Sequence, residues 1–110
     1  MKQEHIGDVL VITLPARLDA AALADVEPVF NAIINAHQGK VLVDMAEVGF
    51  AASLALRMLL MGLKSAQPLG GDVRLCSLQP PVAEIFRKSR FDTLFKIYPD
   101  RAAGLASYAG

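Results

Sequence analysis

Short runs of β-branched and aliphatic residues alternate along the chain with longer segments that carry apolar residues at helical spacing. The short runs predict strands over residues 9–14, 41–45, 73–76 and 95–98, with a further short strand over 2–6 across a Gly7-Asp8 turn. The longer segments predict helices over 20–37, 53–66, from Pro80 onward, and over 101–108. This alternation predicts an α/β fold with a mixed, mostly parallel sheet of four to five strands, covered by about four helices.

The first long helix carries two local signals. Asp19 stands directly before it, where an aspartate side chain accepts hydrogen bonds from the free amide groups. Pro28 lies inside the helical pattern, so the helix either begins near Pro28 or is bent there. If successive parallel strands are added in one direction, right-handed connections place the helices largely on one side of the sheet.

The segment over residues 53–66 is apolar on more than one face. One stripe at helical spacing can face the sheet, and it consists of Leu56, Leu59, Leu60 and Leu63. A second stripe, displaced around the helix, consists of Leu54, Met58 and Met61. Either a neighbouring helix covers this second stripe, or it forms an exposed patch that binds a partner or a second copy of the chain.

The composition favours a single folded domain over residues 1–110. Apolar residues make up 54% of the chain, and 11 basic residues balance 11 acidic residues, so the net charge is zero. These values argue against disorder and against a nucleic-acid partner. No signal-peptide pattern and no apolar run of membrane-spanning length are present, so we expect a cytoplasmic protein without direct membrane insertion.

Groups that carry enzymatic or metal chemistry are sparse in the sequence. Cys76, the single cysteine, lies in a predicted central strand, where a thiol acts as a small apolar side chain. His5 and His37 are far apart in sequence and have no metal-ligand spacing, so both are expected on the solvated surface. We therefore expect no catalysis, no cofactor and no metal; a small-ligand sensor stays open, although no motif points to a pocket.

Four short motifs, taken in order, resemble the STAS domain family of bacterial anti-sigma factor antagonists. Ala16-Arg17-Leu18-Asp19 is similar to the family's G-x-L-D, and the predicted strand over 41–44 ends in an aspartate, Asp44. Residues 50–56 are similar to F-x-D-S-S-G-L, and residues 91–98 are similar to the final leucine-rich turn and strand. The resemblance covers nearly the whole chain and implies a STAS-type fold.

The resemblance also implies regulation by partner switching. In the family, a partner that is both anti-sigma factor and kinase phosphorylates the first serine of the serine pair, and only the unphosphorylated protein binds that partner. The matching residue is Ser53, which we also expect to cap its helix. A phosphate would add a charge of about −1.5 to −2 beside apolar residues and oppose docking. The implied partner-binding set is Asp19, Phe50, Ala52, Ser53, Leu54, Arg57, Met58 and Met61.

Several residues depart from the family pattern. In the motif over residues 50–56, Ala52 replaces the aspartate, Leu54 replaces the second serine and Ala55 replaces the glycine. In the motif over residues 16–19, Ala16 replaces the glycine. Ser53 is therefore either a phosphoacceptor or only a helix cap. The alternative function is a non-phosphorylated subunit of a larger assembly, such as a transport complex or a stress scaffold, and a homodimer also stays open. We expect Asp44 to have a structural role in the loop that follows its strand.

Overall fold

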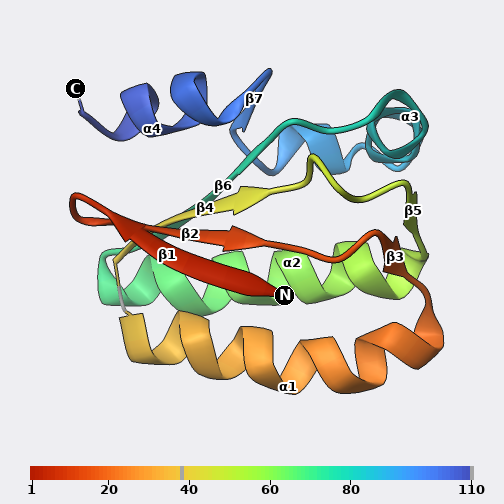
Figure 1. Ribbon diagram of the computed structural model, residues 1–110, viewed down its shortest axis with the longest axis horizontal. Helices are drawn as coiled ribbons and strands as arrows, with labels where there is room; N and C mark the ends of the chain where they lie inside the picture. Colours follow the sequence, from red (N-terminus) through yellow and green to blue (C-terminus); the bar gives the residue numbers. More distant parts are fainter. Residues whose placement is uncertain (38, 110) are drawn as a thin grey trace.

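Five strands form one mixed sheet in the computed structural model, which describes residues 1–37 and 39–109. The strand order is β1-β2-β4-β6-β7 (Figure 1). The strands span β1 (Lys2–Ile6), β2 (Val9–Thr13), β4 (Lys40–Asp44), β6 (Asp72–Cys76) and β7 (Ile97–Tyr98). Only β1 runs antiparallel to its neighbour, and the other pairs are parallel. The predicted α/β fold with a mostly parallel sheet is confirmed.

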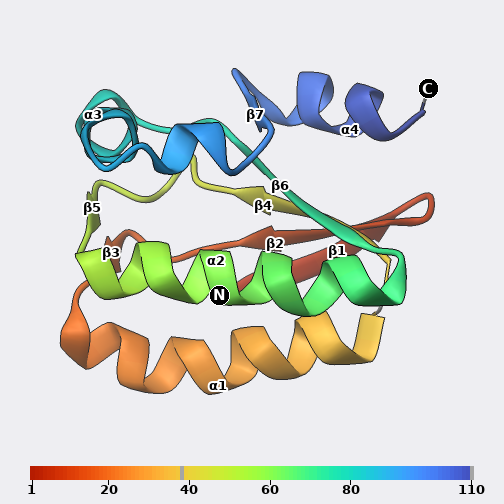
Figure 2. The same ribbon diagram turned by 180° about the vertical axis from the view of Figure 1, so that it is seen from behind.

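Two layers of helices enclose this sheet. The helices are α1 (Ala20–His37), α2 (Ser53–Ala66), α3 (Pro80–Lys88) and α4 (Arg101–Ala109), with short 3-10 turns η1 (Gln67–Leu69) and η2 (Phe91–Thr93). Figures 1 and 2 show α1 and α2 side by side on one face, with α4 on the opposite face. Helices α1, α2 and α3 connect successive parallel strands, and connections of this kind are right-handed as a rule. Helix α4 follows the last strand, so the predicted one-sided arrangement does not extend to it.

The sheet separates two hydrophobic cores of unequal size. The larger core joins the sheet to α1, α2 and α3, and its fully buried members include Ile12, Phe30, Val43, Leu59, Leu75 and Phe86. The smaller core lies under α4 and contains Val9, Val11, Leu42, Cys76 and Tyr108. Alternate residues of a strand point to opposite faces, so β2 and β4 supply both cores. This burial on both faces explains their continuous apolar runs.

Helix α1 runs from Ala20 to His37 with Pro28 in its interior, so a start near Pro28 is wrong. The proline removes one intrahelical hydrogen bond, but buried residues on both sides of it anchor the helix, namely Leu23, Phe30 and Ile34. The last strand is also shorter than predicted, because Phe95 packs into the larger core ahead of it. Among the described helices, none has the length and apolarity needed to cross a membrane.

A second, very short sheet was not predicted. Its parallel strands are β3 (Arg17–Leu18) and β5 (Phe50–Ala51), with Arg17 opposite Phe50. The Ala52 amide continues the ladder by donating to the Leu18 carbonyl at 2.9 Å. Two-residue strands are too short to produce a periodicity in the sequence. This small sheet joins the start of α1 to the start of α2 (Figure 1).

Candidate functional site

The β3–β5 pairing brings together two distant motifs of the sequence. The guanidinium carbon of Arg17 lies 4.6 Å from the centre of the Phe50 ring. The same side chain donates from Nε to Asp19 Oδ2 at 2.8 Å. Arg17 therefore links Asp19 to Phe50 through a cation–π contact and an ion pair. The sequence alone does not indicate this role of Arg17, because its contact with Phe50 depends on the parallel register of β3 and β5.

Asp19 caps α1 as predicted. Its Oδ1 accepts a hydrogen bond from the Ala22 amide at 3.0 Å. The hydrogen bond from the Ala22 amide is the main cause that lowers the pKa of Asp19 below its ordinary value, and the hydrogen bond from the Arg17 side chain is the second. Asp19 is therefore a fixed negative charge beside the start of α2, held mainly by its capping role.

Ser53 is the first residue of α2 and is exposed. Ala52 occupies the capping position, with φ −72° and ψ 162°, and no side chain caps the helix. The prediction that Ser53 caps α2 is therefore wrong by one residue. The first turn of α2 itself contains no acidic side chain, so no carboxylate of this turn interacts with its amide groups and positive dipole end. Such a helix end favours an anionic group such as phosphate.

Large apolar side chains are exposed around Ser53. Phe50 is 41% exposed, Leu54 48% and Met61 51%, and Arg57 is exposed one turn after Ser53. Met58, in contrast, is only 1% exposed. The prediction that Met58 is accessible to a partner on the second stripe is wrong. Helix α1 packs against α2, and Met58 is buried in the larger core. We call the exposed set the α2 outer surface: Phe50, Ser53, Leu54, Arg57 and Met61.

A shallow groove of about 300 Å³ between α1 and α2 adjoins this surface. Glu27 and Asn31 of α1 form one wall, and the facing residues of α2 are Leu54, Arg57, Met58 and Met61. Sequence analysis missed Glu27 and Asn31, since no signal placed the two helices side by side. The groove gives the outer surface a polar rim next to its apolar centre.

The opposite side of α2 holds the helix in place. The stripe predicted to face the sheet is confirmed, with Leu56, Leu59 and Leu63 buried and Leu60 half-buried. Gly62 faces α1, where a Cβ atom would lie 2.8 Å from Phe30 Cε2. Because Phe30 is fully buried, Gly62 sets the close approach of α1 and α2.

Asp44, at the end of β4, has structural contacts. Its Oδ1 accepts from the Ala46 amide at 2.9 Å, and its Oδ2 accepts from Arg101 Nε at 3.0 Å. Arg101 also pairs with Glu4, so α4 is joined to two strands of the sheet. These contacts agree with the structural role expected for Asp44.

The remaining chemically reactive side chains lie outside the α2 outer surface. Cys76 is fully buried in β6, and burial raises the pKa of its thiol. His5 and His37 were expected on the surface; His5 is exposed, His37 is half-buried, and their ring centres lie 5.6 Å from each other. The β1–β2 pairing carries His5 back toward the end of α1, a contact that the sequence does not indicate.

Comparison with known proteins establishes the family. The family model of the STAS domain matches residues 1–104. The chain belongs to the STAS domain family. The predicted STAS-type fold is confirmed by a solved STAS domain protein from Planctomyces limnophilus, described as an anti-sigma-factor antagonist. It is 27% identical, has a TM-score of 0.91, and the match covers 99% of this chain and 97% of that one.

Two further proteins are similar to this chain. BtrV of Bordetella bronchiseptica, whose name assigns it provisionally to the anti-sigma factor antagonists, is 25% identical over 108 residues. That match covers 98% of this STAS domain and 93% of BtrV. The anti-sigma factor antagonist SpoIIAA in its unphosphorylated form has a TM-score of 0.80 at 16% identity, covering 99% and 96% of the two chains. This last likeness concerns the fold alone.

Proposed function

We propose that this STAS domain is a cytoplasmic anti-sigma factor antagonist that binds an anti-sigma factor through the α2 outer surface. The names of its relatives support this class of function. The observation that carries the proposal is the exposure of Phe50 and Leu54 at the start of α2 and of Met61 two turns farther along the same helix. Clustered large apolar side chains on the surface of a small domain are typical of protein interaction sites.

Ser53 is the proposed phosphoacceptor, and the anti-sigma factor is proposed to be its kinase. A phosphoryl group on the Ser53 oxygen would lie at the amide end of α2, so the modified helix would stay folded. Arg57, one turn later, offers a further positive charge. The switch would act on binding instead: a charge of about −1.5 to −2 would have to be desolvated when Phe50 and Leu54 dock against a partner.

The protein carrying an affinity tag, purified from its own cells, tests this proposal. Mass spectrometry should identify an anti-sigma factor with a kinase domain and a phosphorylated fraction of Ser53. Leu54→Glu should lose this partner, because it puts a charge in the apolar surface. Leu69→Glu is the matched control, since Leu69 is 50% exposed but lies in η1, beyond the other end of α2. Equal recovery by both variants would contradict the proposal.

A non-phosphorylated subunit of a larger assembly is the second candidate. The start of α2 favours it, because Ala52 and Leu54 replace an acid and a serine of the family pattern, and the first turn holds no acidic residue. The same purification then yields a fixed transport or scaffold complex. Ser53 remains unmodified under several stresses in that case, which separates the two candidates.

A further inference from the structure

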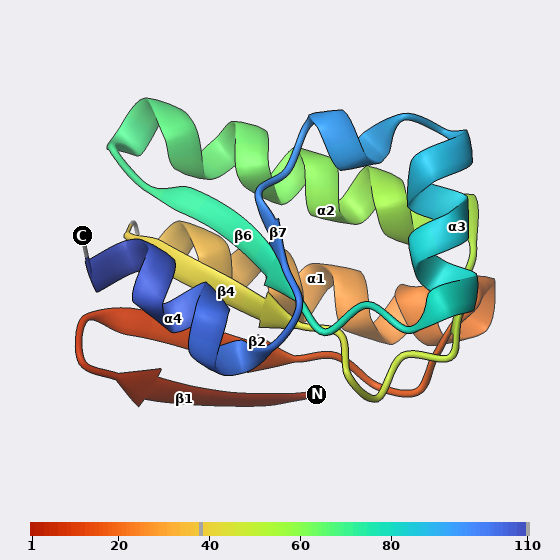
Figure 3. The ribbon, with the colours of Figure 1, turned by 90° about the horizontal axis from the view of Figure 1, so that it is seen from above.

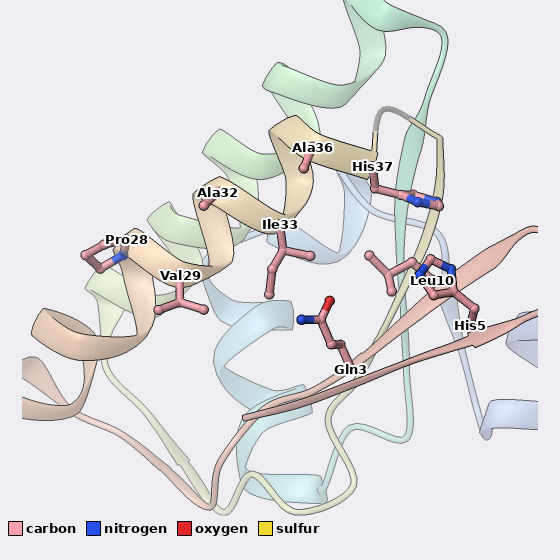
Figure 4. A pocket seen from close by; sticks show the side chains of 9 residues that line it. All are labelled: Gln3, His5, Leu10, Pro28, Val29, Ala32, Ile33, Ala36 and His37. Carbon is pink, nitrogen blue, oxygen red and sulfur yellow. The ribbon is translucent and has the colours of Figure 1, made fainter.

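A pocket of about 650 Å³ lies between β1 and the second half of α1 (Figure 4). One wall is an apolar stripe of α1 at helical spacing, formed by Val29, Ala32, Ile33 and Ala36. The other wall is β1, and Leu10 of β2 also lines the pocket. This volume is within the range of pockets that hold small ligands. The start of α2 lies near the start of α1, away from the histidine end of this pocket (Figure 1), and the pocket shares no lining residue with the α2 outer surface.

The pocket is open because β1 has little cover. Figure 3 shows β1 at the edge of the sheet, and all five of its residues are exposed. On the α1 side, Val29 is also exposed. An apolar body lying in this pocket would therefore remove apolar surface of α1 from water, which favours binding by about 25 cal/mol for each Å² covered.

Polar side chains gather at one end of the apolar stripe. His5 and His37 lie next to each other there (Figure 4), and Gln3 points into the pocket beside Ile33. His37 Nε2 lies 3.0 Å from the Lys40 carbonyl oxygen, which can only accept, so Nε2 carries a proton. The other ring nitrogen of His37 can then donate a hydrogen bond to a carboxylate only when the ring carries a second proton.

The charges around this end favour an anion. Among the described residues, the lining contains two imidazoles and no carboxylate, so the charge that these residues can carry is positive. The nearby Asp8 carboxylate is paired with Lys40 at 2.8 Å and does not oppose a bound anion alone. His37 is in the last turn of α1, which is the negative end of the helix dipole, so a carboxylate bound there depends on hydrogen bonds from the two imidazole side chains.

We propose that this pocket binds a small monocarboxylic acid, with its apolar body along α1 and its carboxylate against His5 and His37. The stripe from Val29 to Ala36 covers eight residues, whose ends lie about 10 Å apart along the helix, and this sets the length of the apolar body. Imidazole N–H groups donate charge-assisted hydrogen bonds to the carboxylate. The inference goes beyond the proposed function, because it concerns a different surface and a different class of partner.

Titration of the isotope-labelled full chain with octanoate, followed by NMR, tests the proposal. Saturable shifts are expected in β1 and in the second half of α1. The absence of saturable shifts would overturn the proposal.

Matched variants locate the site and the charge. Ala32→Trp fills the pocket from an exposed position and should abolish octanoate binding, whereas Ala24→Trp, exposed on the same helix outside the pocket, should retain it. Replacing both His5 and His37 with glutamine should weaken binding about tenfold. Equal binding of octan-1-ol and octanoate, or unchanged binding by the double variant, would overturn the carboxylate assignment.

Discussion

The two sides of α2 consist of similar residues and differ in what covers them. On the inner side, Leu59 is fully buried against the sheet and Met58 lies under α1. On the outer side, Leu54 and Met61 are about half exposed. An apolar stripe in a sequence therefore indicates a surface that is buried in the functional protein. It does not indicate whether the same chain or a partner buries it. Here we assign the inner side to folding and the outer side to a partner.

The largest expected effect is on the inner side. Leu59→Ala should lower the free energy of unfolding by about 2–5 kcal/mol, because it leaves a cavity in a fully buried position. Met61→Ala, at a half-exposed position of the same helix, should change it by less than about 0.5 kcal/mol. Urea unfolding followed by circular dichroism measures both. Similar stability losses in the two variants would remove the distinction between the sides.

Gly62 tests the contact of the inner side with α1. Gly62→Ala should destabilise the protein, because the added methyl group meets Phe30 at 2.8 Å and overpacking costs about 1–3 kcal/mol. Alanine's helix preference recovers only about 1 kcal/mol of this. Ser65→Ala, at an exposed position of α2, is the control and should be neutral or slightly stabilising. A more stable Gly62→Ala protein would show that the helices have room to separate.

The start of α2 differs from the start of α1 in having no capping side chain. Ala52→Asp places a carboxylate at the capping position and should stabilise the protein by about 1 kcal/mol. Thermal unfolding at pH 7 measures the gain. An unchanged or lower melting temperature would mean that the amide groups of this turn are already satisfied.

The smallest expected effect concerns the capped start of α1. The pKa of Asp19 is lowered in the folded protein, so its charge contributes stability above its unfolded pKa of about 3.9, and this contribution is lost as pH falls through the folded pKa. Asp19→Asn keeps a capping acceptor and removes the titration. Melting temperatures between pH 6 and pH 2.5 should fall less steeply for this variant than for the unmodified protein.

Much of the fold could be predicted from the sequence, because it depends on local periodicity. The continuous apolar runs of β2 and β4 and the leucine stripe of α2 are such signals. Contacts between elements could not be predicted in this way. Burial of Met58 depends on α1 lying beside α2, and the approach of His5 to His37 depends on the β1–β2 pairing.

The candidate site could be predicted only in part for the same reason. The motif containing Ser53 is local, and the sequence located it. The role of Arg17 depends on two-residue strands that leave no pattern. The position of Ser53, one residue inside the helix, depends on Ala52 adopting an extended backbone without a capping side chain.

The central claim is that charge on Ser53 controls binding at the α2 outer surface. Its most direct test is the calorimetric affinity of the purified partner for Ser53→Asp, Ser53→Ala and Ser65→Asp, the last being a control at an exposed serine of the same helix. The account predicts that Ser53→Asp weakens binding at least about tenfold, or 1.4 kcal/mol. Ser53→Ala and Ser65→Asp should bind as the unphosphorylated protein does. Equal affinities for Ser53→Asp and Ser53→Ala would contradict the account.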